Sequence, residues 1–257
     1  MKTHALPFLF GTLAGALGGL MGVGGGIILV PLLVHALQRG QHEAQGTSLA
    51  FITVTALLAA VPYFRQGNLD FVLGGLLGLG AVPGVLLGAA LARRVTAQRL
   101  RQAFGVLVLA TAVRILVAAP AHTVVGSVWP HAMNVLLGAV VGCLGGLLGV
   151  GGGTILVPIL VLAERMPQHL AQGISLLMIV PTGIVGAMSH ARHGHLVRSL
   201  LPGLMAGGAV GALLGAFLAQ QIHAPMLSRL FALLLIPVAA QMIFGRARGT
   251  VPLRPEN

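Results

Sequence analysis

Two runs of glycine are the part of this chain best suited to bind a ligand. The six residues concerned are Gly24, Gly25, Gly26, Gly151, Gly152 and Gly153. Without a Cβ, the backbone can leave helical geometry there and free its amide N–H groups. In hydrocarbon such donors must be met by protein, water or ligand, and a helix that starts at the break adds the positive end of its dipole. The runs therefore predict an anion site; the alternative is that they only allow a kink or close packing.

Polar side chains recur on one stripe of the apolar segment that follows each run. At 100° per residue, Gln45, Ser48 and Thr55 lie within about 80° of one another on a helix. The second half of the chain repeats the pattern with Gln172, Ser175 and Thr182. Amide and hydroxyl donors on one line suit an oxyanion; the alternative is hydrogen bonding between helices, worth about 0.6 kcal/mol per bond. We predict that four of these side chains bind substrate: Gln45, Ser48, Gln172 and Ser175.

These matches belong to a repeat that covers most of the chain. The segment Leu17–Pro31 matches Leu144–Pro158 at an offset of 127 residues, and the register then holds without a gap. Over two fifths of the paired positions are identical, which composition alone would not produce, so the chain is a tandem duplication. We divide it into a first transmembrane repeat, a periplasmic linker, a second transmembrane repeat and a cytoplasmic tail, at residues 1–118, 119–130, 131–245 and 246–257.

No catalytic residue is predicted. His42 and His169 stand six residues before the two serines of the stripe, a spacing that rotates a helical side chain by about 240° and shifts it by roughly 9 Å. A histidine–serine nucleophilic pair is therefore excluded, and no carboxylate is placed to orient either imidazole. We expect both histidines to cap helices or anchor interfaces, and the protein not to be an enzyme.

A metal site and a cation path are also disfavoured. His190, His193 and His195 share one predicted loop, which fits a solvated loop better than a metal site. Their counterparts in the first repeat are Tyr63, Gln66 and Asn68. The four acidic residues, at predicted span ends or in the tail, are Glu43, Asp70, Glu164 and Glu256. A cation site or carboxylate relay would need such groups within the membrane, so we predict no metal or cofactor.

Composition places both repeats in a membrane. Charged residues are only 7% of the 257 residues, against about 25% in soluble domains, and hydrophobic residues are 56%. Apolar runs of about 20 residues recur along the chain, each long enough to cross a bilayer. A soluble enzyme is excluded. The net charge of +11 comes from basic residues that cluster in loops, which indicates the inner face of a membrane rather than nucleic acid.

Each repeat is expected to contain one interrupted segment and three ordinary spans. In the first repeat, an apolar stretch at 5–22 ends at the glycine run, and the piece at 26–37 is too short to cross a membrane alone. Spans follow near 43–62, 71–92 and 98–118. The second repeat has its segments at 132–149, 153–163, 170–189, 197–219 and 225–244. The predicted fold class is all-α and polytopic, each repeat an interrupted or re-entrant helix pair plus three transmembrane helices.

Arginine placement predicts the orientation in the membrane. One short connection, expected to be cytoplasmic, holds Arg93, Arg94, Arg99 and Arg101. Arginines also mark the 190–198 loop and the C-terminus as cytoplasmic, whereas the uncharged 119–130 linker belongs outside. The 63–70 loop would then be periplasmic although its counterpart is cytoplasmic. The repeats are therefore expected to be inverted, as in secondary transporters that bind substrate at the repeat interface.

Glycines also recur at every fourth position of one span in each repeat. The matching sets are Gly80, Gly84, Gly88 and Ala92, and Gly207, Gly211, Gly215 and Ala219. Small residues at this spacing make a smooth face for close helix contact. We predict that these stripes serve packing.

The duplicated motifs resemble those of a known family. Gly-x-Gly-Gly-Gly-x-x-x-x-Pro occurs at Gly22–Pro31 and Gly149–Pro158, followed by Ala-Gln-Gly-Thr-Ser at Ala44–Ser48 and Ala-Gln-Gly-Ile-Ser at Ala171–Ser175. Over almost its whole length the chain resembles the TauE/SafE sulfite exporter family, also called the 4-toluene sulfonate uptake permeases. The resemblance implies an inner-membrane carrier for sulfite, sulfoacetate or other organosulfonates. It leaves direction open, because the family includes importers and exporters.

We therefore predict a secondary transporter that moves a small sulfur-containing anion across the bacterial inner membrane by alternating access. Its expected partners are the anionic substrate, a coupling ion (H⁺ or Na⁺) and the lipid bilayer, without nucleic acid; no oligomeric state is predicted. One alternative is a channel for small anions or neutral solutes. The other is a non-transporting intramembrane enzyme or assembly subunit.

Overall fold

The computed structural model describes residues 2–91, 97–117, 127 and 129–244, and in these ranges the only regular structure is helical. The first half contains α1 (Lys2–Met21), α2 (Gly26–Pro31), the π-helical turn η1 (Leu32–Ala36), α3 (Gln41–Arg65), α4 (Phe71–Leu91) and α5 (Ala97–Val117). The second half contains α6 (His131–Leu148), α7 (Gly153–Leu162), α8 (Gln168–Arg192), α9 (Leu201–Gln221) and α10 (Ala224–Phe244). The tail at 246–257, most of the 119–130 linker, and Arg93 and Arg94 lie outside the described residues.

Six helices are long and apolar enough to cross a membrane: α3, α4, α6, α8, α9 and α10. Shorter apolar helices include Ala5–Met21 and Gly26–Ala36 in the first half and Gly153–Leu162 in the second. The prediction of an all-helical, polytopic membrane protein is confirmed. The short helices lie where the glycine runs interrupt the sequence.

The predicted loop at 190–198 was wrong at both of its ends. Helix α8 continues through His190 to Arg192, so His190 is a helical residue and not a loop residue. The helix ends just before Gly194, which has a left-handed φ of 72°, a common way to stop a helix. Helix α9 begins only at Leu201, because residues 198–200 form a turn before it.

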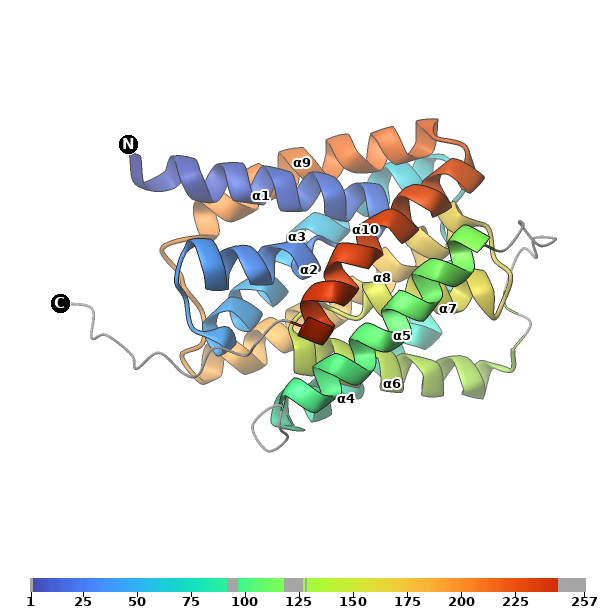
Figure 1. The fold of residues 1–257 in the computed structure, drawn as a ribbon, viewed down its shortest axis with the longest axis horizontal. Coiled ribbons are helices and arrows are strands. Elements are labelled where there is room, and N and C mark those ends of the chain that lie inside the picture. Colours follow the sequence, from blue (N-terminus) through green and yellow to red (C-terminus); the bar gives the residue numbers. More distant parts are fainter. Residues whose placement is uncertain (1, 92–96, 118–126, 128, 245–257) are drawn as a thin grey trace.

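Two pairs of helices pack side by side along most of their length, α1 with α9 and α6 with α4 (Figure 1). Gly207, Gly211 and Gly215 of α9 face the backbone carbonyls of Phe8, Thr12 and Ala16 in α1. Gly80, Gly84 and Gly88 of α4 face the carbonyls of Val135, Ala139 and Cys143 in α6. Both series ascend together, so each pair is parallel. The predicted packing role of the glycine stripes is confirmed.

Helices α3 and α8, which are counterparts in the repeat, pack against each other and run antiparallel. Gly183 of α8 lies beside Thr53 of α3, and Gly186 lies beside the earlier residue Leu49. Helices α5 and α10, another counterpart pair, are also antiparallel and lie in front of α3 and α8 in Figure 1. There the Gln102 amide near the start of α5 donates to the carbonyl of Ile243 near the end of α10, at 3.1 Å.

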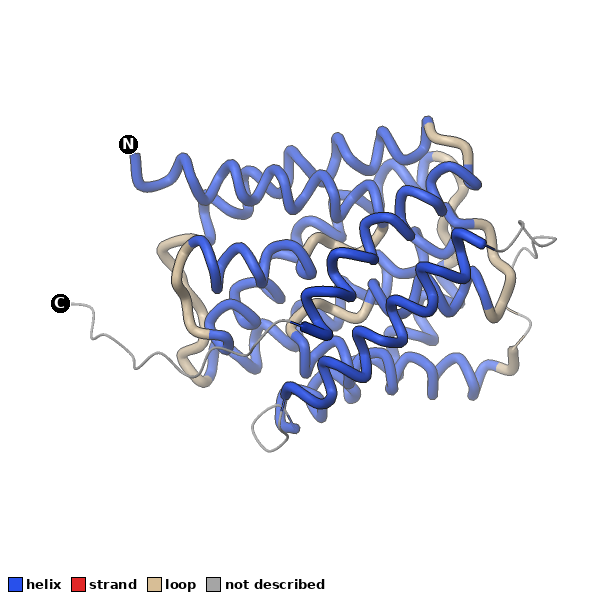
Figure 2. Tube along the Cα trace, viewed as in Figure 1, coloured by secondary structure: helices blue, strands red, loops and turns tan. Residues whose placement is uncertain are grey.

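The interrupted helices end inside the bundle. Gly19 of α1 lies beside Ala212 of α9, which continues to Gln221. Gly146 of α6 lies beside Val85 of α4, which continues to Leu91. Loop segments therefore occur in the interior of the bundle as well as at its two ends (Figure 2). The chain reverses there and returns as a short helix.

Candidate functional site

Each glycine run reverses the chain through left-handed backbone. Gly24 and Gly25 have φ values of 72° and 87°, and the equivalent pair in the second run has 76° and 82°. Glycine adopts this conformation without the steric cost that a Cβ brings. Helix α2 then begins at Gly26 and α7 at Gly153, and both runs are buried. The chain therefore reverses direction at both of the predicted helix breaks.

Among the described residues, no turn or loop hydrogen bond of ordinary geometry is donated by the amides of eight buried residues at these reversals: Gly24, Gly25, Gly26, Ile27, Gly151, Gly152, Gly153 and Thr154. The last two of each set begin α2 or α7, where the first amides of a helix have no partner within the helix. Unpaired buried N–H groups are rare in native proteins, where more than about 90% are satisfied. So many in one place indicates a site for water or for a ligand that accepts hydrogen bonds.

The two runs meet, and a predicted serine stands over each helix start. A Cβ added to Gly26 would lie 3.2 Å from Cα of Val150, and one added to Gly153 would lie 3.1 Å from Cα of Val23. The Oγ atoms of Ser48 and Ser175 would lie 2.9 and 2.7 Å from these added atoms. The structure thus brings the glycine runs and both serines together.

The two predicted glutamines cross between the halves. The side chain of Gln45 packs on Gly149, whereas that of Gln172 packs on Gly22. Nε2 of Gln45 donates to the carbonyl of Leu147 at 3.1 Å, which leaves its buried Oε1 without a partner among the described residues. In Gln172 the free atom is Nε2, a donor. The Oγ of Ser175 is also buried and unpaired within the described structure.

Tyr63 is a site residue that the sequence prediction missed. Its side chain is fully buried at the end of α3, and its hydroxyl lies 2.8 Å from Oε1 of Gln172 and 3.1 Å from the carbonyl of Gly19. A buried tyrosine hydroxyl needs such partners. The available signal was that the one tyrosine of the chain replaces His190 in the repeat, within an otherwise apolar segment.

Three threonines of α3 and α8 hydrogen-bond to backbone groups, two of them across elements. Thr55 Oγ1 donates to the carbonyl of Gly24 at 2.7 Å, whereas Thr182 bonds only within its own helix, at 3.0 Å. Thr47 Oγ1 accepts from the amide of Val197 at 3.1 Å and so holds the connection between α8 and α9 against α3. Its counterpart Ile174 cannot make such a bond.

The two histidines at the starts of α3 and α8 anchor interfaces, as predicted. Nε2 of His169 lies 3.0 Å from the carbonyl of Ala219 near the end of α9. The ring of His42 stacks on that of His195, with 5.2 Å between centroids. Within the described ranges, no group of three or more histidine, cysteine, aspartate or glutamate side chains is arranged to hold a metal ion.

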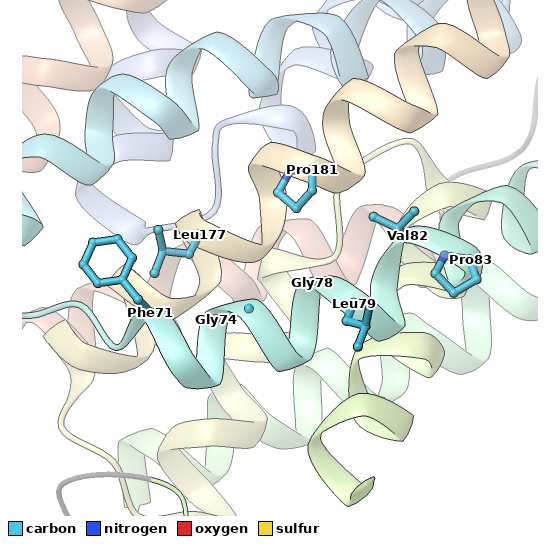
Figure 3. Close-up of a pocket in the computed structure, with 9 residues that line it drawn as sticks. Phe71, Gly74, Gly78, Leu79, Val82, Pro83, Leu177 and Pro181 are labelled. Carbon is cyan, nitrogen blue, oxygen red and sulfur yellow. The ribbon is translucent and has the colours of Figure 1, made fainter. Parts of the chain in front are cut away.

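The central site is closed in this structure. Methyl groups at Gly26 and Gly153 would already meet side-chain and backbone atoms 2.7 to 3.2 Å away, so an oxyanion needs the two reversals to separate. A groove of 710 Å³ lies elsewhere, between α4 and α8 (Figure 3). It is lined only by apolar residues and glycines, between Phe71 and Pro83 on α4 and at Leu177 and Pro181 on α8, which does not suit an anion.

These features define a polytopic membrane protein in which two similar halves place broken helices at a shared centre. The chain belongs to the Sulfite exporter TauE/SafE family, whose model matches residues 6–242. This is a family of membrane transporters.

Curated relatives cover almost the whole chain. "Probable membrane transporter protein YunE" of Bacillus subtilis (strain 168) is 26% identical, over 92% of this chain and 96% of its own length. A "Probable membrane transporter protein" of Xylella fastidiosa (strain Temecula1) is 31% identical, over 91% and 92%. One from Haemophilus influenzae is 27% identical, over 92% and 97%. No solved structure matches the chain.

Proposed function

We propose that this protein is a secondary transporter of small sulfur-containing anions, such as sulfite, sulfoacetate or another organosulfonate. The observation that carries the proposal is that the amides at the two glycine reversals and the helix starts after them donate none of the turn and loop hydrogen bonds of the described residues. Backbone N–H groups at helix starts bind oxyanions without a charged side chain. The unpaired donors Nε2 of Gln172 and Oγ of Ser175 border the same space.

Transport would proceed by alternating access between two inverted halves. Counterpart helices α3 and α8 run antiparallel, which supports a two-fold axis lying across the helices rather than along them. Under that symmetry one half opens the site to one side of the membrane while the other half closes it. The contact between the glycine runs would correspond to a closed state, which separates when an anion enters.

The protein would lie in the bacterial inner membrane with its C-terminus in the cytoplasm. Three arginines support this orientation. Arg39 precedes the start of α3, and Arg192 and Arg198 lie at the end of α8 and in the connection that follows it. Because α3 and α8 are antiparallel, the start of α3 and the end of α8 lie at the same end of the bundle. Positive residues favour the cytoplasmic side. The proposal includes no enzymatic step.

Flux measurements in proteoliposomes test this function. The purified protein should take up radiolabelled sulfite or sulfoacetate with saturable kinetics, and an excess of the unlabelled anion should compete. Trans-stimulation by the same anion inside the vesicles should distinguish a carrier from a channel. Uptake no faster than in protein-free vesicles for both anions would contradict the proposal.

A further inference from the structure

Three histidines connect the protein surface to a buried position in the last turn of α8. His193 is exposed, His195 is half-buried and His190 is only 6% exposed. The ring centroids of His193 and His195 are 6.1 Å apart, and those of His195 and His190 are 5.8 Å apart. His42 joins the line from α3 by stacking on His195. The four rings therefore form one connected cluster.

The innermost ring has no structural explanation. Both nitrogens of His190 are buried and have no hydrogen-bond partner in the described part of the chain. A neutral imidazole carries one donor and one acceptor, and leaving both unpaired costs stability. A histidine kept only for packing would be replaced favourably by an apolar side chain.

His190 is linked to the proposed anion site through the repeat. It is the repeat counterpart of Tyr63, whose hydroxyl bonds to Gln172. On its own side, His190 packs on Gly46, the residue that follows Gln45 in α3: a Cβ added to Gly46 would lie 2.8 Å from Cβ of His190. The His190 ring therefore occupies the position at which the first half places Tyr63, which bonds to Gln172.

The cluster is confined to one half of the molecule. The counterparts of His190, His193 and His195 are Tyr63, Gln66 and Asn68, none of which changes charge near neutral pH. The counterpart of His42 is His169, which already bonds to the carbonyl of Ala219. The two halves of the site therefore differ in their ability to take up a proton.

The groups that face His190 are themselves histidines. His42 faces it from α3, and His193 and His195 face it from the connection that follows α8. Of the charged residues on these elements, Glu43 accepts a hydrogen bond from the amide of Gly40, and Arg192 and Arg198 are exposed. Positive charges that approach one another repel, so the cluster would take up few protons at a time.

We propose that His190 is the proton-binding site that couples anion transport to a proton gradient, with His193 and His195 carrying the proton inward from the surface. This inference rests on the proposed transport function. Histidine is the side chain whose unperturbed charge change lies closest to neutral pH, and a bound anion would offset the burial that disfavours the charged form of His190. The protonated ring supplies the positive charge that the amide cradle lacks, so proton and anion bind together. Loss of the proton weakens anion binding and releases it.

The test compares two modes of transport in proteoliposomes with radiolabelled sulfoacetate, whose sulfonate keeps its charge over this pH range. The first mode is accumulation driven by a pH gradient with the voltage clamped at zero. The second is exchange of labelled for unlabelled anion at equal pH. His190→Tyr copies the counterpart residue Tyr63 and removes the titratable ring. His195→Asn copies Asn68 at a less buried position, and His223→Gln, in the connection before α10, is the control.

We expect His190→Tyr to lower gradient-driven accumulation about tenfold, and exchange, which in the native protein should be faster at the more acidic of two equal pH values, to become independent of pH. His195→Asn should slow accumulation by a smaller factor, and His223→Gln should change neither mode. Unchanged accumulation in both His190→Tyr and His195→Asn would overturn the inference, as would accumulation that follows a sodium gradient alone. Absence of exchange in the native protein would instead contradict the transport function itself.

Discussion

The hydroxyl of Tyr63 lies 2.8 Å from Oε1 of Gln172, so a residue at the end of α3 fixes the amide of a residue near the start of α8. The same hydroxyl lies 3.1 Å from the carbonyl of Gly19, just before the first glycine run. With Oε1 engaged, the amide group of Gln172 presents its Nε2 as a free donor. Tyr63 is thus placed to orient Gln172, the side chain of the other half that we propose binds substrate.

Removing that hydroxyl should affect affinity through Gln172. Tyr63→Phe should raise the apparent KM for sulfoacetate a few-fold with little change in kcat, since a hydrogen bond of about 1 kcal/mol is lost. In a Gln172→Ala background the same change should have no further effect on KM. Flux kinetics for the two single variants and the double variant measure this coupling. Thr53→Ala removes a hydroxyl that bonds only within α3 and serves as control.

The two glutamines should behave differently when truncated. Gln172→Ala removes an unpaired donor, and we expect the anion affinity to fall about tenfold, with a cost of 1–3 kcal/mol for an unmatched ligand oxygen. Gln45→Ala removes the bond to the Leu147 carbonyl, so it should also lower the melting temperature. Competition of unlabelled against labelled anion and thermal melts distinguish the two. Equal affinities for both variants and the native protein would contradict a role for either side chain in binding.

Glycines on the packing stripes should matter for stability and not for affinity. A Cβ at Gly84 would meet the backbone carbonyl of Ala139, which cannot move aside, so Gly84→Ala should destabilise the protein by about 1–3 kcal/mol. Gly75, in the same helix, has open space around an added Cβ. Gly75→Ala should therefore leave the melting temperature unchanged or raise it. A reversed order of melting temperatures would contradict the parallel packing of α4 on α6.

If the two repeats are inverted, as we propose, the ends of α3 and α8 should face opposite sides of the membrane. Gln66 and His193 are repeat counterparts, and both are exposed just after their helices. In a Cys143→Ser background, Gln66→Cys should react with an impermeant thiol reagent from the periplasmic side. His193→Cys should react only from the cytoplasmic side. Labelling of both from one side would contradict the inversion.

Much of this fold could be predicted from the sequence because membrane spans are marked by apolar runs and the repeat by matching glycines. The starts of α2 and α7 at Gly26 and Gly153 coincide with the predicted breaks. The extension of α8 through His190 was missed because histidine and arginine near a glycine resemble a loop when read alone. The segment remains helical because its backbone hydrogen bonds continue up to Gly194, whose left-handed φ ends the helix.

The site was predictable only in part, because its contacts join residues far apart in the chain. The stripe of Gln45, Ser48 and their counterparts follows from helical spacing and needs no tertiary information. The bond between Tyr63 and Gln172 spans 109 residues and no periodicity reports it. The closed contact between the glycine runs likewise depends on how α3 and α8 bring the two halves together.

The most direct measurement of the anion cradle is sulfoacetate uptake by Gly152→Val at matched amounts of folded protein. A side chain there would lie 2.9 Å from Cγ1 of Val141, at a φ of 82°, and would distort the left-handed reversal that positions the amides of the second run. Gly67→Val introduces the same strain at a φ of 71° in open surroundings, so it controls for the backbone effect. We predict that Gly152→Val folds but loses uptake, whereas Gly67→Val retains it. Native uptake by folded Gly152→Val would contradict the cradle and leave the glycine reversals as kinks.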